Sequence, residues 1–413
     1  MKLRLTLPKE LKLAIPNNIN LTEICAWLCV VFSGFYLYGT PIISPVYISF
    51  FTVLAVVIFG LFTGDKCSFN KVYISALMPI VYIGITQPLL FHLEVLGQCI
   101  AFAYFILTVY LLNNFDNRKI VKISEHFLCF STILFAIDTY LRVHSALHGA
   151  NLISSFYAFK GGSIMWNDTN GLGLQVVVMF FLALYLDIIQ PKKSYKVYQL
   201  ILFIVTILSF SRMSIVAIVV FWIIFKQARK LFSLKNIILM LSFGLAFLLL
   251  QNCFTSLNLF EGRSLDSKFY VISKTIDYIK NADLSSILFG VGLANTKSVL
   301  GYWPGHNYFS MYFVGSGLIG FLVVSSLLFY ISIKTRFKAL IIILPILFNG
   351  FSVYIMYNAF FFSSLAIIYL IERNLSQKNE NLYLEPVLLK PSCCHAELVS
   401  ASVQLLDSET SSG

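Results

Sequence analysis

Long apolar runs alternate with short basic clusters along most of the sequence. The runs are about 15 to 25 residues long, the length that a helix needs to cross the hydrocarbon core of a bilayer. Phe and Tyr recur through the runs rather than gathering in one region. Only 12% of the 413 residues are charged, against about a quarter in soluble domains. The pattern predicts an all-α membrane protein and excludes a soluble enzyme, a disulfide-rich secreted domain and a disordered chain.

We predict twelve transmembrane helices from these runs. Their ranges are 22–40, 42–63, 72–91, 95–112, 124–143, 172–189, 197–211, 213–226, 236–251, 307–333, 338–350 and 352–371. Every second connection is short and basic, and Lys and Arg concentrate in the cytoplasmic loops of membrane proteins. The distribution of the basic residues therefore predicts a fixed orientation with both termini in the cytoplasm. It also accounts for the net charge of +11, so we predict no binding to nucleic acid.

Two external segments are larger than the other connections. The predicted organisation is a cytoplasmic N-terminus (1–21), helices 1–5 (22–143), an external loop (144–171), helices 6–9 (172–251), a long external loop (252–305), helices 10–12 (306–371) and a disordered cytoplasmic tail (372–413). An amphipathic stretch within the long loop, 270–279, is expected to form a helix along the membrane surface. Long external loops on helical bundles commonly carry the function, so we look for the site beside them.

Arg212 lies between two short apolar runs, in the sequence Ser-Phe-Ser-Arg-Met-Ser. From Lys196 to Lys226 the chain takes 30 residue steps, or about 45 Å of helix, whereas two full crossings need about 60 Å. A single long span is the alternative, but it inverts the basic connections that follow. We therefore predict a hairpin whose tip places Arg212 below the outer surface. An arginine there is a functional candidate, and the structural alternative is an arginine that caps helix carbonyls.

His306 and Asn307 lie where the long loop re-enters the membrane, in Trp-Pro-Gly-His-Asn-Tyr-Phe. The N-terminus of a helix attracts anions, and a histidine at that position can contact a phosphate or move a proton. We predict His306 as a catalytic residue with Asn307 beside it. The alternative is that His306 is structural, which is commoner for an isolated histidine.

Other polar residues border the external loops. Arg263 begins a basic part of the long loop whose charge is nearly cancelled by neighbouring acids, so a solvated loop face is its alternative. Asp138 and Arg142 are four residues apart, at contact distance on a helix, and are expected to form an ion pair that holds the bundle. Asp168, Thr169 and Asn170 precede the sixth span. One of them is expected to cap that helix, and the alternative is that they bind sugar hydroxyls.

Some patterns are excluded as sites. Gly315-Ser-Gly-Leu-Ile-Gly320 matches a nucleotide-binding pattern, but it lies within a membrane span without a preceding strand, and its small residues favour close packing. The cluster Cys393-Cys394-His395 offers too few ligands for a metal. The sequence contains no P-loop, no His-Glu-x-x-His and no Asp-x-Asp. We therefore predict no metal site and no cofactor.

Together, these features resemble the bacterial O-antigen ligases and O-antigen polymerases. The resemblance covers about 150–333 and rests on the order of its motifs. These are Asn167-Asp-Thr-Asn170-Gly-Leu-Gly, Ser211-Arg212 at a short hairpin, a long loop after the ninth span, Gly290-Val-Gly292, and His306-Asn307 followed by Gly315-Ser-Gly317. The chain departs from the family in having Met213-Ser214 after the arginine and a single arginine, Arg263, in the long loop.

The resemblance implies a metal-independent glycan transferase, multi-pass in the bacterial inner membrane, with its active side facing the periplasm. Its donor is then a glycan on undecaprenyl diphosphate, and its acceptor is lipid A–core or a growing glycan chain. Arg212 and Arg263 are expected to meet the diphosphate charge, and His306 to take the acceptor proton or to hold the diphosphate. Asn307, Asn170 and Asp168 are the expected substrate contacts.

Three alternatives stay open at this level. An O-antigen polymerase shares the chemistry of a ligase and differs in its acceptor; the dominant long loop favours the ligase. A flippase for lipid-linked oligosaccharides explains the many spans without catalysis, but transporters of this kind tend to show two similar halves, and no internal repeat is visible. A purely structural membrane protein does not explain Arg212 and His306 on one face.

Overall fold

The computed structural model describes residues 21–37, 44–62, 71–87, 93–149, 164–166, 169–227, 263–301, 307–351 and 358–388. Across these ranges the chain is helical, without β-strands, which confirms the all-α prediction. Five of the described helices are long and apolar enough to cross a membrane, and shorter apolar helices accompany them. The protein is therefore suited to a membrane, while the number of twelve spans stays a prediction.

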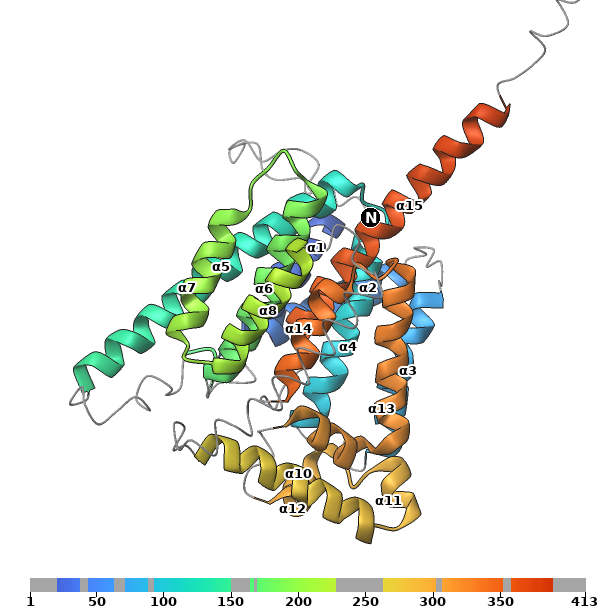
Figure 1. Ribbon diagram of the computed structural model, residues 1–413. Helices are drawn as coiled ribbons and strands as arrows, with labels where there is room; N and C mark the ends of the chain where they lie inside the picture. Colours follow the sequence, from blue (N-terminus) through green and yellow to red (C-terminus); the bar gives the residue numbers. More distant parts are fainter. Residues whose placement is uncertain are drawn as a thin grey trace, which may run out of the picture.

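The helices follow the predicted spans along the chain (Figure 1). The first group is α1 (Leu21–Val31) with its 3-10 turn η2 (Phe32–Gly34), α2 (Pro45–Phe62), α3 (Lys71–Thr86), α4 (Leu93–Leu112) and α5 (Asn117–Gly149). The second group is α6 (Thr169–Ile189), α7 (Lys196–Leu208) and α8 (Arg212–Gln227). The third group is α10 (Arg263–Asn281), α11 (Leu284–Phe289), η5 (Leu293–Asn295), α12 (Thr296–Leu300), α13 (Tyr308–Lys334), α14 (Leu340–Gly350) and α15 (Ala359–Leu388). The predicted span 236–251 lies outside the described residues.

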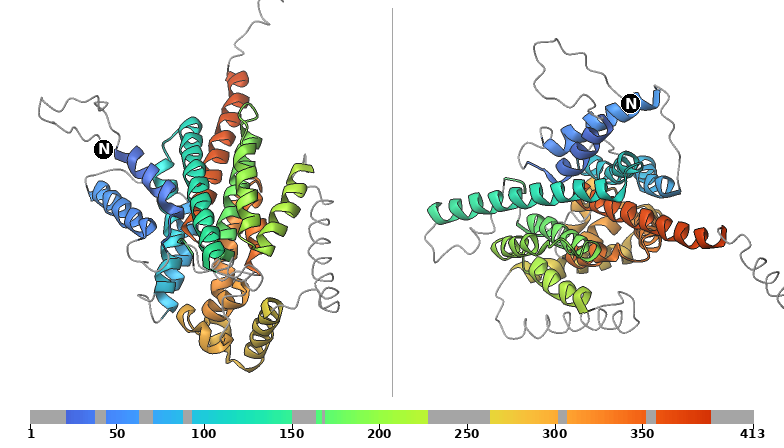
Figure 2. Two further views of the ribbon diagram at one scale, coloured as in Figure 1. Left: turned by 90° about the vertical axis from the view of Figure 1, so that its left-hand side faces the viewer. Right: turned by 90° about the horizontal axis from the view of Figure 1, so that it is seen from above.

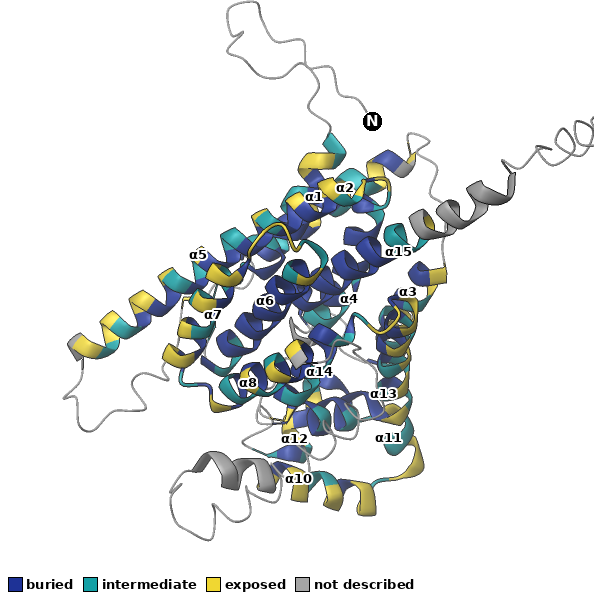
Figure 3. Cartoon of the chain, turned by 45° about the horizontal axis from the view of Figure 1, so that its top comes forward, coloured by how far each residue is buried: buried dark blue, intermediate teal, exposed yellow. Residues whose placement is uncertain are grey.

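Helices α4, α6 and α15 form the centre of the bundle (Figure 3). Sixteen of the 21 residues of α6 are buried, as expected for a helix that is apolar on every side. Aromatic rings join α15 to its neighbours: Phe362 contacts Phe102 of α4, and Phe360 contacts Phe127 of α5, with ring centroids 4.8 and 4.9 Å apart. The outer helices instead expose large apolar side chains, such as Phe62 and Ile85. This arrangement fits a bundle solvated by lipid.

One end of the bundle is held by charged side chains. Glu23 at the start of α1 pairs with Lys119, and Glu125 of α5 pairs with Lys193 at 2.8 Å. Glu372 of α15 pairs with Lys338 at 3.0 Å. The basic partners all belong to connections predicted to face the cytoplasm, so we call this end the inner end. The opposite end, which carries the α7–α8 turn, is called the outer end.

Two helices extend beyond their predicted limits. Helix α15 continues to Leu388, so residues 372–388 of the tail that we predicted to be disordered are helical. Its continuation begins with the buried Glu372 and with Arg373, whose guanidinium donates to Asn113 at 2.6 Å. These contacts anchor the helix past its apolar part. Helix α5 likewise runs to Gly149, into the segment predicted as an external loop, and passes the end of α7 (Figure 2).

The described part of the predicted long external loop, residues 263–301, folds into a layer of helices at the outer end (Figures 1 and 2). Helix α10 includes the amphipathic stretch 270–279 that we predicted to be helical. Its buried side chains Val271 and Tyr278 pack against Leu300 of α12 and against Met311 and Val314 of α13. At least one face of this helix therefore covers protein rather than the membrane surface.

Candidate functional site

The site is built around the turn that joins α7 to α8 at the outer end. Helix α7 ends at Leu208 and α8 begins at Arg212, so the predicted hairpin is present. Between them, Phe210 adopts a φ of 53°, which is rare for a residue with a side chain and lets the chain reverse within three residues. The two helices contain 13 and 16 residues, or about 20 and 24 Å at 1.5 Å per residue. Both are shorter than a hydrocarbon core of about 30 Å.

Arg142 of α5 holds the end of α7. Its guanidinium Nη2 donates to the carbonyl oxygen of Leu208 at 2.8 Å, and the side chain is buried. One turn earlier on α5, the buried Asp138 accepts a hydrogen bond from the backbone N–H of Met165 at 3.2 Å. Both charged residues thus contact backbone of neighbouring segments. Arg142 thus caps a helix carbonyl, the kind of contact that we considered as the alternative for Arg212.

Buried hydroxyl and amide groups fix the tip of the hairpin. The hydroxyls of Ser211 and Ser214 lie 2.9 Å apart, and Ser214 donates to Oδ1 of Asn349 on α14 at 3.1 Å. Asn349 in turn donates to the carbonyl of Pro345. A Cβ on Gly173 of α6 would lie 2.6 Å from the Ser214 hydroxyl, so α6 can approach this closely only with glycine there. Three helices therefore lock the residues on both sides of Arg212.

The end of α14 also contacts the start of α13. Phe351, which follows α14, packs on Phe309 with ring centroids 4.8 Å apart. Asn307 caps α13: its Oδ1 accepts the backbone N–H of Ser310 at 3.1 Å, and the side chain is 3% exposed. The hairpin tip and the entry of α13 thus converge on one helix end. Asn307, predicted as a substrate contact, has a capping role in the structure.

Helix α13 is broken at Gly317, where φ is 68°. The carbonyls of Val314 and Gly315, which the break releases, accept the backbone N–H groups of Val291 and Gly292 at 2.9 and 3.0 Å. We call this contact the glycine clip. It needs glycine on both sides, because a Cβ on Gly317 would lie 2.3 Å from the carbonyl oxygen of Leu288. The two glycine patterns of the sequence therefore pack against each other, and the predicted span 307–333 is bent rather than straight.

Two side chains, one on α3 and one on the residue that follows it, complete the clip. Gln87, which is 4% exposed, accepts the N–H of Leu293 at 2.6 Å and donates to the carbonyl of Gly315 at 3.5 Å. The hydroxyl of Tyr82 donates to the carbonyl of Ser316. Irregular backbone within a membrane protein is tolerated where protein groups satisfy it, and these contacts provide that. The clip fixes the direction in which α13 leaves the external layer.

The electrostatics of this end are set by exposed cations and one stabilised carboxylate. Arg212 is exposed at the N-terminus of α8, where the helix dipole adds positive potential. In the external layer, Asp283 caps α11, and hydrogen bonds from Ser285 and Ser286 lower the pKa of its carboxyl to about 2. Desolvation raises the pKa of Tyr278, whose hydroxyl donates to the carbonyl of Ser286. The hairpin tip thus places a cationic side chain at a helix N-terminus.

Two buried polar side chains of α6 lack hydrogen-bond partners among the described residues. Both amide atoms of Gln175 and the hydroxyl of Thr169 have no hydrogen-bond partner within the described part of the chain, although both residues are fully buried. A buried polar group without a partner costs free energy. These atoms are therefore suited to water or to the polar part of a substrate.

The remaining predicted residues stand as follows. Arg263 is the first residue of α10, and its side chain is outside what the structure describes. His306 and Asp168 lie outside the described residues. Asn170 is the second residue of α6, half-buried and within the helix, so it is not the residue before the helix that we proposed as a cap.

Sequence reasoning missed the partners of the hairpin tip. Asn349 lies within an apolar run, and a polar amide there is costly unless it is bonded; that was a usable signal. The Ser211 and Ser214 spacing of three residues places both on one helix face, which was a second signal. The pairing of the two glycine patterns had no local signal, because it depends on how distant segments meet.

In comparisons with known proteins, no family model matches the chain, and no curated protein matches it.

Proposed function

We propose that this protein is an O-antigen ligase-like glycosyltransferase of the bacterial inner membrane. It moves a glycan from undecaprenyl diphosphate to lipid A–core at the periplasmic face. The observation that carries the proposal is the position of Arg212. It is exposed at the N-terminus of α8, on a tip fixed by Ser211, Ser214 and Asn349, and this tip converges with the entry of α13 on the end of α14.

The proposed reaction needs positive charge at this place. The acceptor hydroxyl oxygen forms a bond to the anomeric carbon, and the bond from that carbon to the diphosphate oxygen breaks. The electron pair leaves with the lipid diphosphate, and the hydroxyl proton passes to a base. Fixed positive charge aimed at developing negative charge is commonly the largest catalytic contribution. Arg212 and the N-terminal dipole of α8 supply that charge without moving, because the tip is held by buried hydrogen bonds.

His306 is proposed either to take the acceptor proton or to hold the diphosphate. It directly precedes Asn307, the N-cap of α13, and this cap is held near the hairpin by the contact of Phe309 with Phe351. Arg263, at the start of α10, is proposed to add a second positive charge from the external layer. No metal enters the proposed mechanism, since fixed cations take the role that a metal has in other sugar transferases.

The test is complementation of a gene deletion, with surface polysaccharide and lipid-linked intermediates separated on gels. The deletion is expected to leave bare lipid A–core and long polymer on the lipid carrier. Arg212→Ala is expected to lower glycan transfer by about a hundredfold or more, the effect of removing one such charge-stabilising group. Lys226→Ala is the matched control, because Lys226 is an exposed cation at the other end of the same helix.

Each other outcome is informative. Core that carries a single repeat unit in the deletion strain assigns the polymerase reaction instead. Unchanged polysaccharide in both fractions excludes both enzymes and favours the flippase or a structural role. If Arg212→Ala and His306→Ala retain full transfer in a stably expressed protein, the proposed site is wrong.

A further inference from the structure

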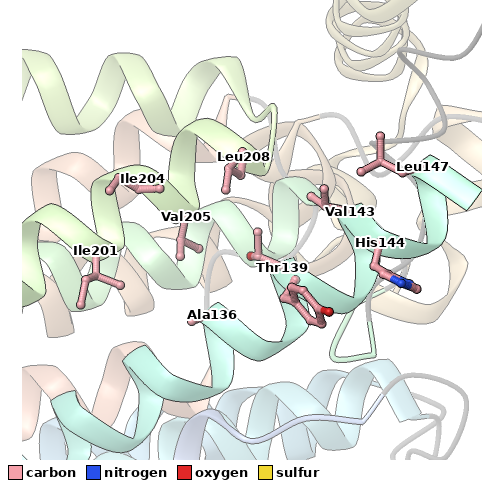
Figure 4. A pocket seen from close by; sticks show the side chains of 10 residues that line it. Ala136, Thr139, Val143, His144, Leu147, Ile201, Ile204, Val205 and Leu208 are labelled. Atoms are coloured by element: carbon pink, nitrogen blue, oxygen red, sulfur yellow. The ribbon is translucent and has the colours of Figure 1, made fainter. Parts of the chain in front are cut away.

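A groove of about 370 Å³ lies between α5 and α7, in the outer part of the bundle (Figure 4). Its walls are almost entirely apolar and come from both helices, with Ala136 and Val143 on one side and Val205 and Leu208 on the other. Leu208 is also the residue whose carbonyl accepts from Arg142. The groove therefore ends next to the outer end of α7, where α5 continues past it.

The groove opens on a surface that faces hydrocarbon. Tyr140 and Ile204, which border it, are 66% and 47% exposed. Water in a cavity needs two to four polar partners, and seven of the ten lining residues are apolar, so most of the groove offers water no partner. An unfilled groove leaves its lining atoms without dispersion contacts on one side. In a membrane, a hydrocarbon chain is the occupant that fits these walls.

Three polar side chains interrupt the apolar lining, namely Thr139, Tyr140 and His144, and the first and last of them carry the argument. Thr139 is 3% exposed, and its hydroxyl has no hydrogen-bond partner among the described residues. Figure 4 shows its side chain between the two helices, inside the groove. His144 lies five residues further along α5, about 7.5 Å along the helix axis toward its outer end at 1.5 Å per residue. A ligand that fits both has a hydrogen-bond acceptor within its apolar part and a polar group just beyond it.

We propose that this groove binds one acyl chain of an anionic glycerophospholipid from the outer leaflet. The hydroxyl of Thr139 donates to the ester carbonyl of that chain, and the phosphate, a few bonds further on, lies at His144. Arg142 contributes positive charge between the two positions, and Asp138, which binds the backbone of Met165, contributes negative charge one turn deeper. A prenyl chain fits the same walls but has no carbonyl for Thr139.

The site is separate from glycan transfer and depends only on the membrane orientation. A lipid held here contacts Leu208, the last residue of α7, whose carbonyl accepts from Arg142. Its expected consequence is that the bound lipid stabilises the hairpin.

The experiment is native mass spectrometry of the full chain in detergent, titrated with palmitoyl-oleoyl phosphatidylglycerol or with the phosphatidylcholine of the same chains. We expect one phosphatidylglycerol to bind more tightly than the others and more tightly than phosphatidylcholine. Ala136→Phe fills the groove and is expected to weaken this binding about tenfold or more, as the loss of two buried methylenes does. Val219→Phe adds the same ring to the exposed surface of α8 and is expected to change nothing.

Two further variants keep the test decisive if Ala136→Phe does not fold. Thr139→Val keeps the shape of the side chain and removes one hydrogen bond, so binding is expected to weaken about fivefold. His144→Ala is expected to reduce the preference for phosphatidylglycerol over phosphatidylcholine. Equal lipid binding by wild type, Ala136→Phe and Thr139→Val overturns the proposal. Displacement of the bound lipid by equimolar undecaprenyl phosphate also overturns it, because the occupant is then a prenyl lipid.

Discussion

The inner end of the bundle is held together by opposite charges, whereas at the outer end, apart from the contact of Arg142 with Leu208, the hairpin tip is held by neutral hydrogen bonds. At the inner end, Glu125 and Glu372 each pair with a lysine from a different helix or connection. At the tip, Ser211, Ser214 and Asn349 form a chain of hydroxyl and amide groups. The described contacts of the tip thus fix its geometry through neutral groups, whereas those of the inner end join charged side chains.

The largest effect is expected where the outer end depends on backbone geometry. Gly317→Ala forces a Cβ against the carbonyl of Leu288 at a φ of 68°. Strain and overlap together are expected to destabilise the protein by about 3 kcal/mol or more. Thermal unfolding in detergent measures this loss. Gly84→Ala on α3 is the matched control, because nothing lies within 4 Å of its added Cβ, and it should leave stability unchanged or slightly raised. Similar melting of both variants would contradict the clip.

At the inner end, the buried Glu372 is expected to contribute more than an exposed partner in an ion pair. Its carboxylate accepts from Lys338 and from the buried Tyr185 at 2.7 Å. Glu372→Ala is expected to lower the free energy of unfolding by about 2–3 kcal/mol. Glu23→Ala removes an exposed pair with Lys119 and is expected to cost less than about 1 kcal/mol. Thermal unfolding of the two variants side by side tests this ranking, and an equal loss would refute it.

At the hairpin tip, the effect of removing a neutral partner is expected to be smaller and independent of salt. Asn349→Ala leaves the Ser214 hydroxyl without its acceptor, which is expected to destabilise the protein by about 1–2 kcal/mol. Repeating the unfolding measurement at high ionic strength separates the two ends. Salt screens exposed charges, so the effect of Glu23→Ala should shrink while that of Asn349→Ala stays constant. A strong salt dependence of Asn349→Ala would show that charge also operates at the tip.

The smallest effect is expected from acid at Asp283. Hydrogen bonds from Ser285 and Ser286 lower the pKa of this carboxyl to about 2, below its unfolded value of about 4. Its stabilising contribution is therefore fully present above pH 4 and is lost as the pH falls toward 2. The difference in melting temperature between wild type and Asp283→Asn should shrink over that range. A difference that is constant from pH 6 to pH 3 would contradict the shifted pKa.

The positions of the helices were predictable from the sequence because apolar runs are local signals. The hairpin was predictable for the same reason: the distance between Lys196 and Lys226 is too short for two full crossings, whatever the other helices do. The tail was less tractable. Its polar composition predicted disorder, yet α15 continues to Leu388, and Glu372 and Arg373 at the start of the continuation contact segments that are distant in the sequence.

The site was predictable only in part. The sequence identifies Arg212 by its isolation between apolar runs, but it does not reveal that Asn349 fixes the tip, since that contact spans 135 residues. The position of Asn307 at the start of a predicted helix indicated that its side chain makes polar contacts. That position fits an N-cap as well as a substrate contact. Only the geometry separates these roles. The break in α13 could not be predicted, because a pattern of small residues such as Gly315-Ser-Gly317 is also typical of a continuous helix that packs closely against a neighbour.

The order of the chain has a consequence for how the break in α13 is made in the cell. Among the described residues, the groups that satisfy its released carbonyls precede it in the sequence: Tyr82, Gln87, Val291 and Gly292 are all synthesised before Val314. Chains fold as they emerge, from the N-terminus onward. These partners are therefore already synthesised when α13 enters the bilayer. A nascent chain that ends after Lys334 contains the described groups that hydrogen-bond to the broken part of the helix.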